Sequence, residues 1–191
     1  MVKLIQSKVL LLALGGNIAG SWGDPRATLE RAIRELESAG IKIVRRSNLY
    51  RTQPLGVGRQ PPYLNLVLAA EAGLAPAGLL RLAKRIEQRA GRRLTPPMHS
   101  RPLDIDILDY GGRRFGWPPL RRQRGRIILP HPQMHARAFV LVPLCEVAPS
   151  WRHPVMGLSA RTLLARLTAA ARAGVSQALD FAPGTCKKSG C

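Results

Sequence analysis

The segment SRPLDIDILDYGG, which begins at Ser100, places three acidic residues within six positions of a chain that holds 30 Lys and Arg but only 11 Asp and Glu. In an extended strand, successive side chains point to opposite faces, so the aliphatic residues share one face and Asp104 and Asp106 share the other. Carboxylates spaced in this way stand about 7 Å apart. They repel each other unless a cation lies between or over them. The spacing therefore indicates a cation-binding pair.

Arginines accompany the two acids. Arg101 lies three residues before Asp104, and Arg92 and Arg93 precede the proline-containing loop that leads to it. Mg²⁺ typically takes one or two carboxylates and completes its shell with phosphate oxygens, and arginine offers a planar fork of donors to phosphate. The pattern favours a site for Mg²⁺-bound polyphosphate. The plain alternative is a polar strand face that is simply covered by solvent.

His131 and His135 have the i, i+4 spacing of a metal pair, but Pro132 indicates the start of a helix rather than its interior. No third ligand is nearby in sequence, so a zinc site is disfavoured. His131 is then either a polar residue in a turn or a donor to a nucleotide at the positive end of a helix.

Tyr63 and Asn65 alternate on one face of an expected strand, beside a loop rich in proline and glycine. An aromatic plate with an amide suits a flat heterocycle, although an ordinary strand face has the same pattern. Phe139 taken alone reads as a core residue. The chain has no G-x-x-x-x-G-K-[ST] loop, no G-x-G-x-x-G turn and no G-x-S-x-G elbow.

The formal charge of +19 implies anionic partners, or else a basic surface that solvent covers. The three cysteines have no framework spacing, which suits a reducing compartment, and we expect a cytoplasmic protein. The apolar run near the N-terminus could resemble a signal peptide but fits a buried strand better. No stretch approaches the length of a membrane span, so no membrane partner is expected.

Periodicity and turn residues predict an α+β fold. The predicted order is β-α-β-β-α-β, a ferredoxin-like core with a four-stranded antiparallel sheet and helices on one face. We expect one domain over 1–174, with a disordered tail over 175–191. The predicted strands cover 9–14, 41–52, 63–72 and 103–108, and a Gly-Gly-Asn turn follows the first of them. One helix is capped by Asp24 and begins at Pro25, a second begins at Pro76, and they end near Gly40 and Gly91. A basic loop or hairpin arm covers 113–126, and C-terminal helices cover 132–149 and 159–174, the second of them capped by Ser159.

Four segments in order resemble the 6-hydroxymethyl-7,8-dihydropterin pyrophosphokinase family of folate biosynthesis. They are LYRTQPLGVGRQPPYLN, RIEQRAGR, RPLDIDILDYGG and LPHPQMHARAFVLVPLCEVAPSWRHP. The most specific is similar to the family's R-x-x-D-[LI]-D-[IL] strand. The resemblance runs from about Val9 to about Leu164. It implies transfer of diphosphate from ATP to the pterin alcohol, with release of AMP, by a monomer without a specific nucleic-acid partner.

The resemblance also implies roles for individual residues. Two Mg²⁺ ions would be bound by Asp104 and Asp106, and the catalytic set would add Arg92 and Arg101. The ATP site would comprise Glu87, Arg92, Arg101, Arg126, His131 and Arg137. The pterin site would comprise Thr52, Pro54, Leu55, Gly56, Tyr63, Asn65 and Phe139, with Tyr63 and Phe139 on either side of the ring, which replaces the core assignment of Phe139.

The chain departs from the family's pattern in three places. MHSR stands where WGPR is usual, which changes the packing of a loop expected to act as a lid with the loop at 53–62. Gly-Gly-Asn replaces G-S-N after the first strand, and TQPLG replaces a double-proline version. Two other functions share part of this pattern. A different Mg²⁺-dependent nucleotidyl or phosphoryl transferase would also use D-x-D on a strand, but its Gly-Ser turn is not found about ten residues before the acids. An RNA-binding ferredoxin-like module would suit the charge, but 5% aromatic residues is too few for its stacking surface.

Overall fold

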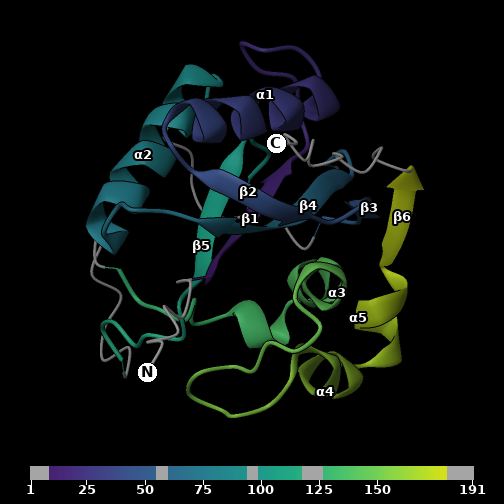
Figure 1. Cartoon of the computed structure of the whole chain (residues 1–191). Coiled ribbons are helices and arrows are strands. Elements are labelled where there is room, and N and C mark those ends of the chain that lie inside the picture. The colour runs from purple at the N-terminus through teal and green to yellow at the C-terminus, as the bar shows by residue number, and fades with distance from the viewer. Residues whose placement is uncertain (1–8, 55–59, 94–98, 118–126, 180–191) are drawn as a thin grey trace, which may run out of the picture.

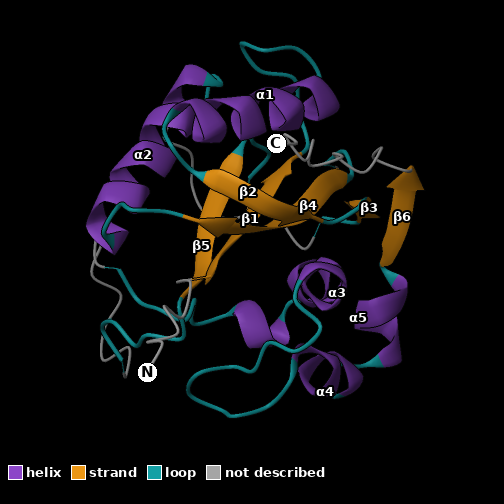
Figure 2. Ribbon diagram, in the orientation of Figure 1, coloured by secondary structure: helices purple, strands orange, loops and turns teal. Residues whose placement is uncertain are grey.

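The computed structural model describes residues 9–54, 60–93, 99–117 and 127–179. A central sheet separates two helical layers: α1 and α2 lie on one face, and α3 and α4 on the other (Figures 1 and 2). Along the chain the elements are β1 (Val9–Gly16), α1 (Pro25–Ser38), β2 (Lys42–Arg46), β3 (Leu49–Thr52), β4 (Tyr63–Glu71), α2 (Pro76–Arg89), β5 (Asp104–Tyr110), the 3₁₀ turn η1 (Met134–Ala136), α3 (Ala138–Val147), α4 (Ala160–Ala165), α5 (Ala169–Ala173) and β6 (Val175–Leu179).

The sheet has six strands in the order β5-β1-β4-β3-β6, and β2 also pairs with β4. Every pairing is antiparallel. The α+β class and the antiparallel sheet are confirmed, but the count of four strands is not. The two helices expected within the core, α1 and α2, share one face of the sheet, and the C-terminal helices α3 and α4 lie on the other. Two differences in the strands explain the count.

The first difference is that the predicted strand 41–52 is two strands. Both pair with β4, and Ser47 lies between them. The Ser47 hydroxyl accepts a hydrogen bond from the Val67 amide, and the Ser47 amide donates to the Val67 carbonyl. A side chain thus replaces one ladder contact, which breaks the regular pairing.

The second difference is at the C-terminus, where Val175–Leu179 forms β6 along β3. The expectation of a disordered tail from residue 175 is therefore wrong for these five residues. Residues 180–191 lie outside the described residues. Alternation is hard to recognise in such a short segment, and its partner strand is more than a hundred residues away in sequence.

The helix starts agree with their predicted caps. The Asp24 side chain accepts from the Ala27 amide at 2.8 Å, and Ser159 caps α4 in the same way at 3.1 Å. The predicted helix 132–149 instead begins as a 3₁₀ turn, because Arg137 has extended backbone angles and separates η1 from α3. The predicted helix 159–174 is divided in two, since Thr168 caps a new helix, α5.

Two apolar clusters hold the layers together. Alternate residues of β1 point to opposite faces, so Leu10 and Leu12 pack under α1 and α2, while Leu11 packs against α3. A strand covered on both faces reads as a continuous apolar run, which is why residues 9–14 were predicted to be buried. Of the basic arm at 113–126, residues 118–126 lie outside the described residues, and the pairing of Phe115 with Leu129 closes its base.

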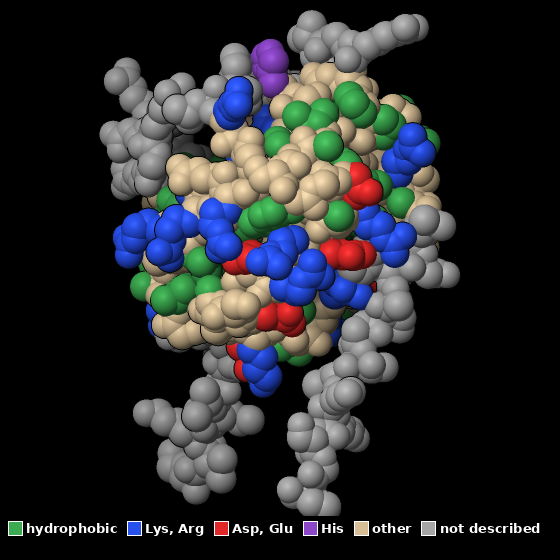
Figure 3. Space-filling view, turned by 90° about the horizontal axis from the view of Figure 1, so that it is seen from above, with side chains coloured by type: hydrophobic (Ala, Val, Ile, Leu, Met, Phe, Trp, Pro, Cys, Tyr) green, Lys and Arg blue, Asp and Glu red, His purple; other side chains and the backbone are tan. Residues whose placement is uncertain are grey.

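The outer face of α1 and α2 carries many of the basic side chains (Figure 3). Acids lie among them: Arg26 pairs with Glu30, and Arg31 and Arg89 both pair with Glu35. Exposed pairs of this kind contribute at most about 1 kcal/mol each. This face therefore fits the simpler account of the charge, a solvated basic surface. Within the described ranges, none of the helices has the length and apolar character needed to cross a membrane.

Candidate active site

Strand β5 presents its two acids on one face, as predicted. Asp104 pairs with Gly15 of β1, and Asp106 pairs with Ala13. The intervening Ile105 packs into the core under α1 and α2. The carboxylates therefore lie on the face that α3 covers, and the sequence prediction of a shared face is confirmed by the geometry.

Two arginines contact Asp104. Arg92, which follows α2, binds one carboxylate oxygen, and Arg101 binds the other at 2.8 Å. Burial alone would raise the pKa of Asp104, but the two guanidinium groups outweigh it and hold the pKa below its ordinary value. Asp104 is thus an ionised carboxylate with two cations already beside it.

Glu87 of α2 contacts both Arg92 and the backbone of β5. Its side chain is 2% exposed. One oxygen accepts from the Ile105 amide at 2.8 Å and lies 2.8 Å from Arg92, and the other binds Lys84 at 2.8 Å. β5 ends the sheet, so the Ile105 amide has no strand partner on that side, and Glu87 satisfies it. Burial raises the pKa of Glu87, although Lys84 and Arg92 oppose the shift.

Asp106 has a looser environment. Its nearest cationic partners are Arg137 at 3.5 Å and His131 at 3.9 Å, beyond the usual length of an N–H···O bond. Burial and the neighbouring Asp104 charge raise the pKa of Asp106, and burial lowers the pKa of His131. The His131 amide donates to the Leu108 carbonyl at 2.8 Å, which anchors the histidine to the edge of β5.

Asn17, just after β1, fixes the segment that carries Arg101. Its side-chain oxygen accepts from the Arg101 amide at 2.8 Å, and its amide nitrogen donates to Ser100 and to the Pro61 carbonyl, both at 3.1 Å. Asn17 therefore joins the loop before β5 to the loop before β4. These two loops therefore meet on one side chain.

Two residues predicted to bind the pterin, Asn65 and Thr52, lie on β4 and β3, which β1 separates from β5. Asn65 of β4 donates to the hydroxyl of Thr52 at 2.8 Å, and both side chains are buried. Gly15 pairs with Asn65 on one side and with Asp104 on the other. Adjacent strands lie about 4.8 Å apart, so the Asn65 and Asp104 backbones are about 10 Å apart across Gly15. The two halves of the predicted site therefore share one row of the sheet.

The two predicted aromatic plates are both partly exposed. The Tyr63 hydroxyl donates to the His99 carbonyl at 3.0 Å, which ties it to the loop before β5. Phe139, near the start of α3, packs against the α3-side cluster, and the Arg137 guanidinium lies 5.6 Å from its ring centroid. Pro54 lies two residues after Thr52 in the chain, whereas Leu55, Gly56 and Arg126 lie outside the described residues.

Sequence reasoning missed two contributors. Lys84, three residues before Glu87 on α2, was not among the predicted site residues, although its i, i+3 spacing from an acid is visible in the sequence. Asn17 was noted only as part of a Gly-Gly-Asn turn. Its link to Arg101 spans 84 positions, and no local pattern reports such a contact.

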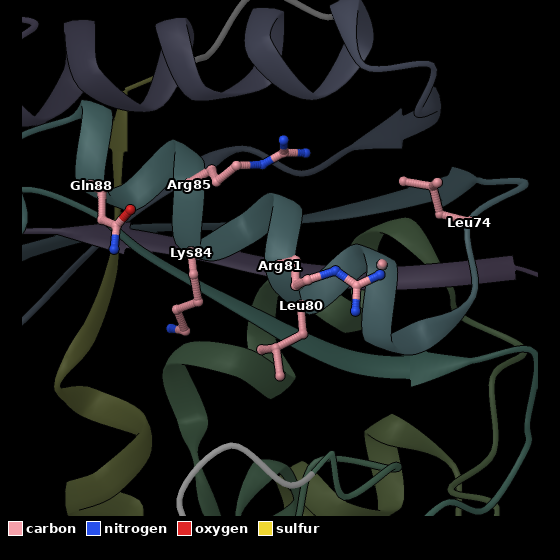
Figure 4. A pocket seen from close by; sticks show the side chains of 7 residues that line it. Leu74, Leu80, Arg81, Lys84, Arg85 and Gln88 are labelled. Atoms are coloured by element: carbon pink, nitrogen blue, oxygen red, sulfur yellow. The ribbon is translucent and has the colours of Figure 1, made fainter.

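A pocket of about 540 Å³ lies along the outer side of α2 (Figure 4). Its lining residues are Leu74, Gly78, Leu80, Arg81, Lys84, Arg85 and Gln88. Leu80 and Lys84 extend to one side of the helix and Arg85 to the other. Among the described residues, no predicted site residue lines it, and one lining residue, Lys84, binds Glu87 of the carboxylate cluster.

The carboxylate pair fits a hard divalent cation. Asp104 and Asp106 supply oxygen donors on one face, and the cationic groups nearest Asp106, Arg137 at 3.5 Å and His131 at 3.9 Å, lie beyond the usual length of a hydrogen bond. Mg²⁺ accepts such a set because it needs few protein ligands and keeps positions for water and phosphate. A zinc pair of His131 and His135 is not supported, since the His135 ring lies against His153, with centroids 6.2 Å apart.

An antiparallel sheet between helical layers, with paired carboxylates faced by arginines, defines an α+β enzyme that handles phosphate groups. Comparison with known proteins identifies the family. Residues 11–149 match the family model described as 7,8-dihydro-6-hydroxymethylpterin-pyrophosphokinase (HPPK), and the chain belongs to this family. It is therefore an ATP-dependent diphosphotransferase of folate biosynthesis.

Curated relatives of the chain bear the name of the same enzyme. The chain is 36% identical over 185 residues to the 2-amino-4-hydroxy-6-hydroxymethyldihydropteridine pyrophosphokinase of Synechocystis, covering 91% of this chain and 89% of the relative. The Pseudomonas aeruginosa protein of the same name is 38% identical over 144 residues, covering 75% of this chain and 82% of the relative.

Solved structures support the fold. A Plasmodium falciparum HPPK-DHPS structure in complex with pteroate superposes with a TM-score of 0.62 at 15% identity, covering 83% of this chain and 44% of that chain. Another, the A437G form with STZ-DHP, has a TM-score of 0.62, covering 86% of this chain and 47% of that chain. The chain thus spans less than half the length of these structures.

Proposed function

We propose that the chain transfers the diphosphate of ATP to 6-hydroxymethyl-7,8-dihydropterin and releases AMP. One observation carries the assignment to a site: two carboxylates share one face of β5, with Arg92, Arg101 and Arg137 at ion-pair distance. Family membership supplies the reaction class, and the neighbouring Asn65–Thr52 pair supplies a place for the acceptor.

On the phosphate side, Asp104 and Asp106 would hold magnesium, and the family resemblance implies two ions. When bound, the metal neutralises phosphate charge and orients the chain of phosphates. Arg92 and Arg101 now bind Asp104, and we propose that they turn to phosphate oxygens when the nucleotide enters. His131 and Arg137 face Asp106 from the α3 side and would complete the ATP site, together with Glu87 and Arg126.

On the pterin side, Asn65 would read the hydrogen-bonding edge of the ring. Its bond to Thr52 fixes the orientation of its amide and leaves the oxygen and one N–H for a ligand. Tyr63 and Phe139 would lie against the two faces of the ring. Pro54, Leu55 and Gly56 would border it from the loop that follows β3.

The reaction needs positioning and charge stabilisation more than covalent help from the protein. The oxygen of the pterin hydroxymethyl group attacks the β-phosphorus of ATP. The bond from that phosphorus to the α,β-bridging oxygen breaks, AMP departs with the electron pair, and the hydroxyl proton is lost. The arginines would stabilise the charge that develops on the transferring group and on the leaving oxygen.

We also propose a ferredoxin-like core, a single catalytic domain and a monomeric state. Strands β5, β1 and β4, with β2 and β3 in place of one strand, follow the spatial order of a ferredoxin-like split βαβ core, and β6 is an addition. We propose one catalytic domain that extends through β6, acting as a monomer in the cytoplasm. Pterin and ATP are then its partners, without a specific nucleic acid.

Separation of the nucleotide products tests the proposal. Purified protein is incubated with Mg²⁺, ATP and 6-hydroxymethyl-7,8-dihydropterin, and parallel samples lack the pterin. We expect AMP in amounts equal to the pterin consumed. ADP would mean transfer of a single phosphoryl group, and free pyrophosphate would mean nucleotidyl transfer; either result would overturn the proposed reaction.

A further inference from the structure

The C-terminal strand β6 lies against the strand that carries Thr52. Val175 pairs with Thr52, Ser176 with Arg51, and Gln177 with Tyr50. The family model ends at residue 149, so this strand lies outside the part of the chain that the family model matches. It nevertheless borders the pterin side of the proposed site (Figure 1).

β3 depends on its neighbours for its position. It has four residues, and its pairing to β4 covers only Tyr50–Thr52. Without β6 it would be a short strand at the edge of the sheet, with unpaired backbone groups facing outward. β6 therefore pairs with β3 on the side opposite β4, so that β3 is no longer an edge strand.

This pairing reaches the predicted pterin residues directly. Thr52 is the last residue of β3, paired with Tyr63 on one side and with Val175 on the other. Its hydroxyl accepts the 2.8 Å bond that orients the Asn65 amide. A shift of β3 by a fraction of a strand spacing would therefore break this bond and turn the amide.

β6 contributes little to the core. Ser176 and Gln177 are exposed, and Val175 and Ala178 are only partly buried. No residue of the preceding helix α5 is buried. The strand therefore acts mainly through backbone pairing, and its loss should disturb β3 more than the two apolar clusters.

We infer that β6 is a positioning element for the pterin site: its backbone pairing with β3 holds Thr52, and through Thr52 the Asn65 amide, in the binding geometry, without contacting substrate. This inference rests on the proposed function. It gives the C-terminal segment a part in recognition of the acceptor but not of ATP. The described residues proposed for ATP lie at the end of α2 and just after it, in the loop before β5, and in the segment 131–137.

A pair of prolines tests the inference. Successive strand residues direct their N–H groups to opposite sides, so one of Ser176 and Gln177 must face β3, and proline removes both donors. The test variant is Ser176→Pro/Gln177→Pro. The matched control is Ser176→Ala/Gln177→Ala, which removes the same side chains but keeps both N–H groups.

Steady-state kinetics with each substrate varied give the first readout. We expect the proline variant to raise the KM for the pterin about tenfold while the KM for ATP changes less than twofold, and the alanine variant to behave as wild type. Equal rises in both KM values would show a general loss of structure and overturn the inference. An unchanged pterin KM in a variant whose β3 amides exchange rapidly would overturn it as well.

Hydrogen exchange gives a readout that does not depend on turnover. In the wild type, addition of pterin with a non-hydrolysable ATP analogue should slow exchange of the amides of 175–179, although this strand does not touch the ligand. No slowing in an enzyme that makes AMP would contradict the positioning role alone. A wild type that makes no pterin-dependent AMP would instead contradict the proposed function.

Discussion

The side-chain oxygen of Asn65 lies 2.5 Å from the point at which a β-carbon on Gly15 would stand. Real β-carbons do not come this close to another heavy atom, so the glycine leaves the space that the Asn65 amide fills. Because Gly15 also pairs with Asp104, the absence of a side chain at this position shapes both halves of the site.

Replacement of Gly15 by alanine should therefore impair acceptor binding. The new methyl group pushes the Asn65 amide away from Thr52 and from the ligand. We expect the KM for the pterin to rise at least tenfold, measured by initial rates at saturating ATP. Gly73→Ala is the matched control, because a β-carbon there meets nothing within 4 Å; it should behave as wild type. Equal KM values in the two variants would contradict the proposed place of Asn65.

Glu87→Ala should be strongly destabilising. The substitution leaves the Ile105 amide and Arg92 without a buried carboxylate partner, and loss of one member of a buried ion pair costs about 3 kcal/mol or more. Urea unfolding measures the change. Glu30→Ala removes an exposed ion pair on α1 and should cost less than about 1 kcal/mol. Similar losses in both variants would show that Glu87 does not hold β5 to α2.

Asp104→Asn and Asp106→Asn should have opposite effects on the stability of the protein without ligands. Asp104 is stabilised as an anion by two arginines, so its loss should cost about 2 kcal/mol. Burial and the Asp104 charge raise the pKa of Asp106, so neutralising it should leave the melting temperature unchanged or raise it. Thermal unfolding in EDTA at pH 7.5 measures both. Destabilisation by both substitutions would contradict the asymmetry.

Stability should fall in mild acid because of His153. This side chain is 1% exposed, and burial, with a smaller contribution from His135, lowers its pKa below 6.5. The unfolded chain then takes up a proton more readily than the folded chain. The contribution of His153 is complete above pH 6.5 and is lost as the pH falls towards its folded pKa, by at most about 1.4 kcal/mol per pH unit.

Urea unfolding between pH 7.5 and pH 5 tests this prediction. His153→Asn keeps an acceptor for the Val155 and Met156 amides, which now donate to Nδ1 of the histidine, but does not titrate in this range. The variant should lose less stability than the wild type as the pH falls. His131, whose pKa burial also lowers, leaves some pH dependence in both proteins. Identical slopes would contradict the assignment to His153.

Local patterns predicted those parts of the site that depend on one element. Alternation placed Asp104 and Asp106 on one face of a strand, and the caps at Asp24 and Ser159 were visible as single residues before a helix. The continuous apolar run of β1 predicted a strand buried on both faces. These features arise from neighbours within a few positions, which is the range that periodicity reports.

Contacts between distant segments were not predictable in the same way. Nothing near Ser47 indicates that its hydroxyl takes the place of a ladder contact, and nothing near Val175 indicates that it pairs with Thr52. The role of Asn17 likewise depends on a partner 84 positions away. Assignments of individual binding residues came from the family resemblance, and they remain predictions.

The most direct test of the account compares two substitutions of the same residue type on the same strand. Asp106→Asn removes a proposed metal ligand, whereas Asp109→Asn alters a buried aspartate that accepts a bond from Trp151 at 3.2 Å and lies outside the proposed site. The measurement is the rate of pterin-dependent AMP formation at saturating Mg²⁺ and ATP. We expect a loss of at least about 100-fold for Asp106→Asn and a near wild-type rate for Asp109→Asn. An Asp106→Asn enzyme of normal rate, or equal losses in both variants, would contradict it.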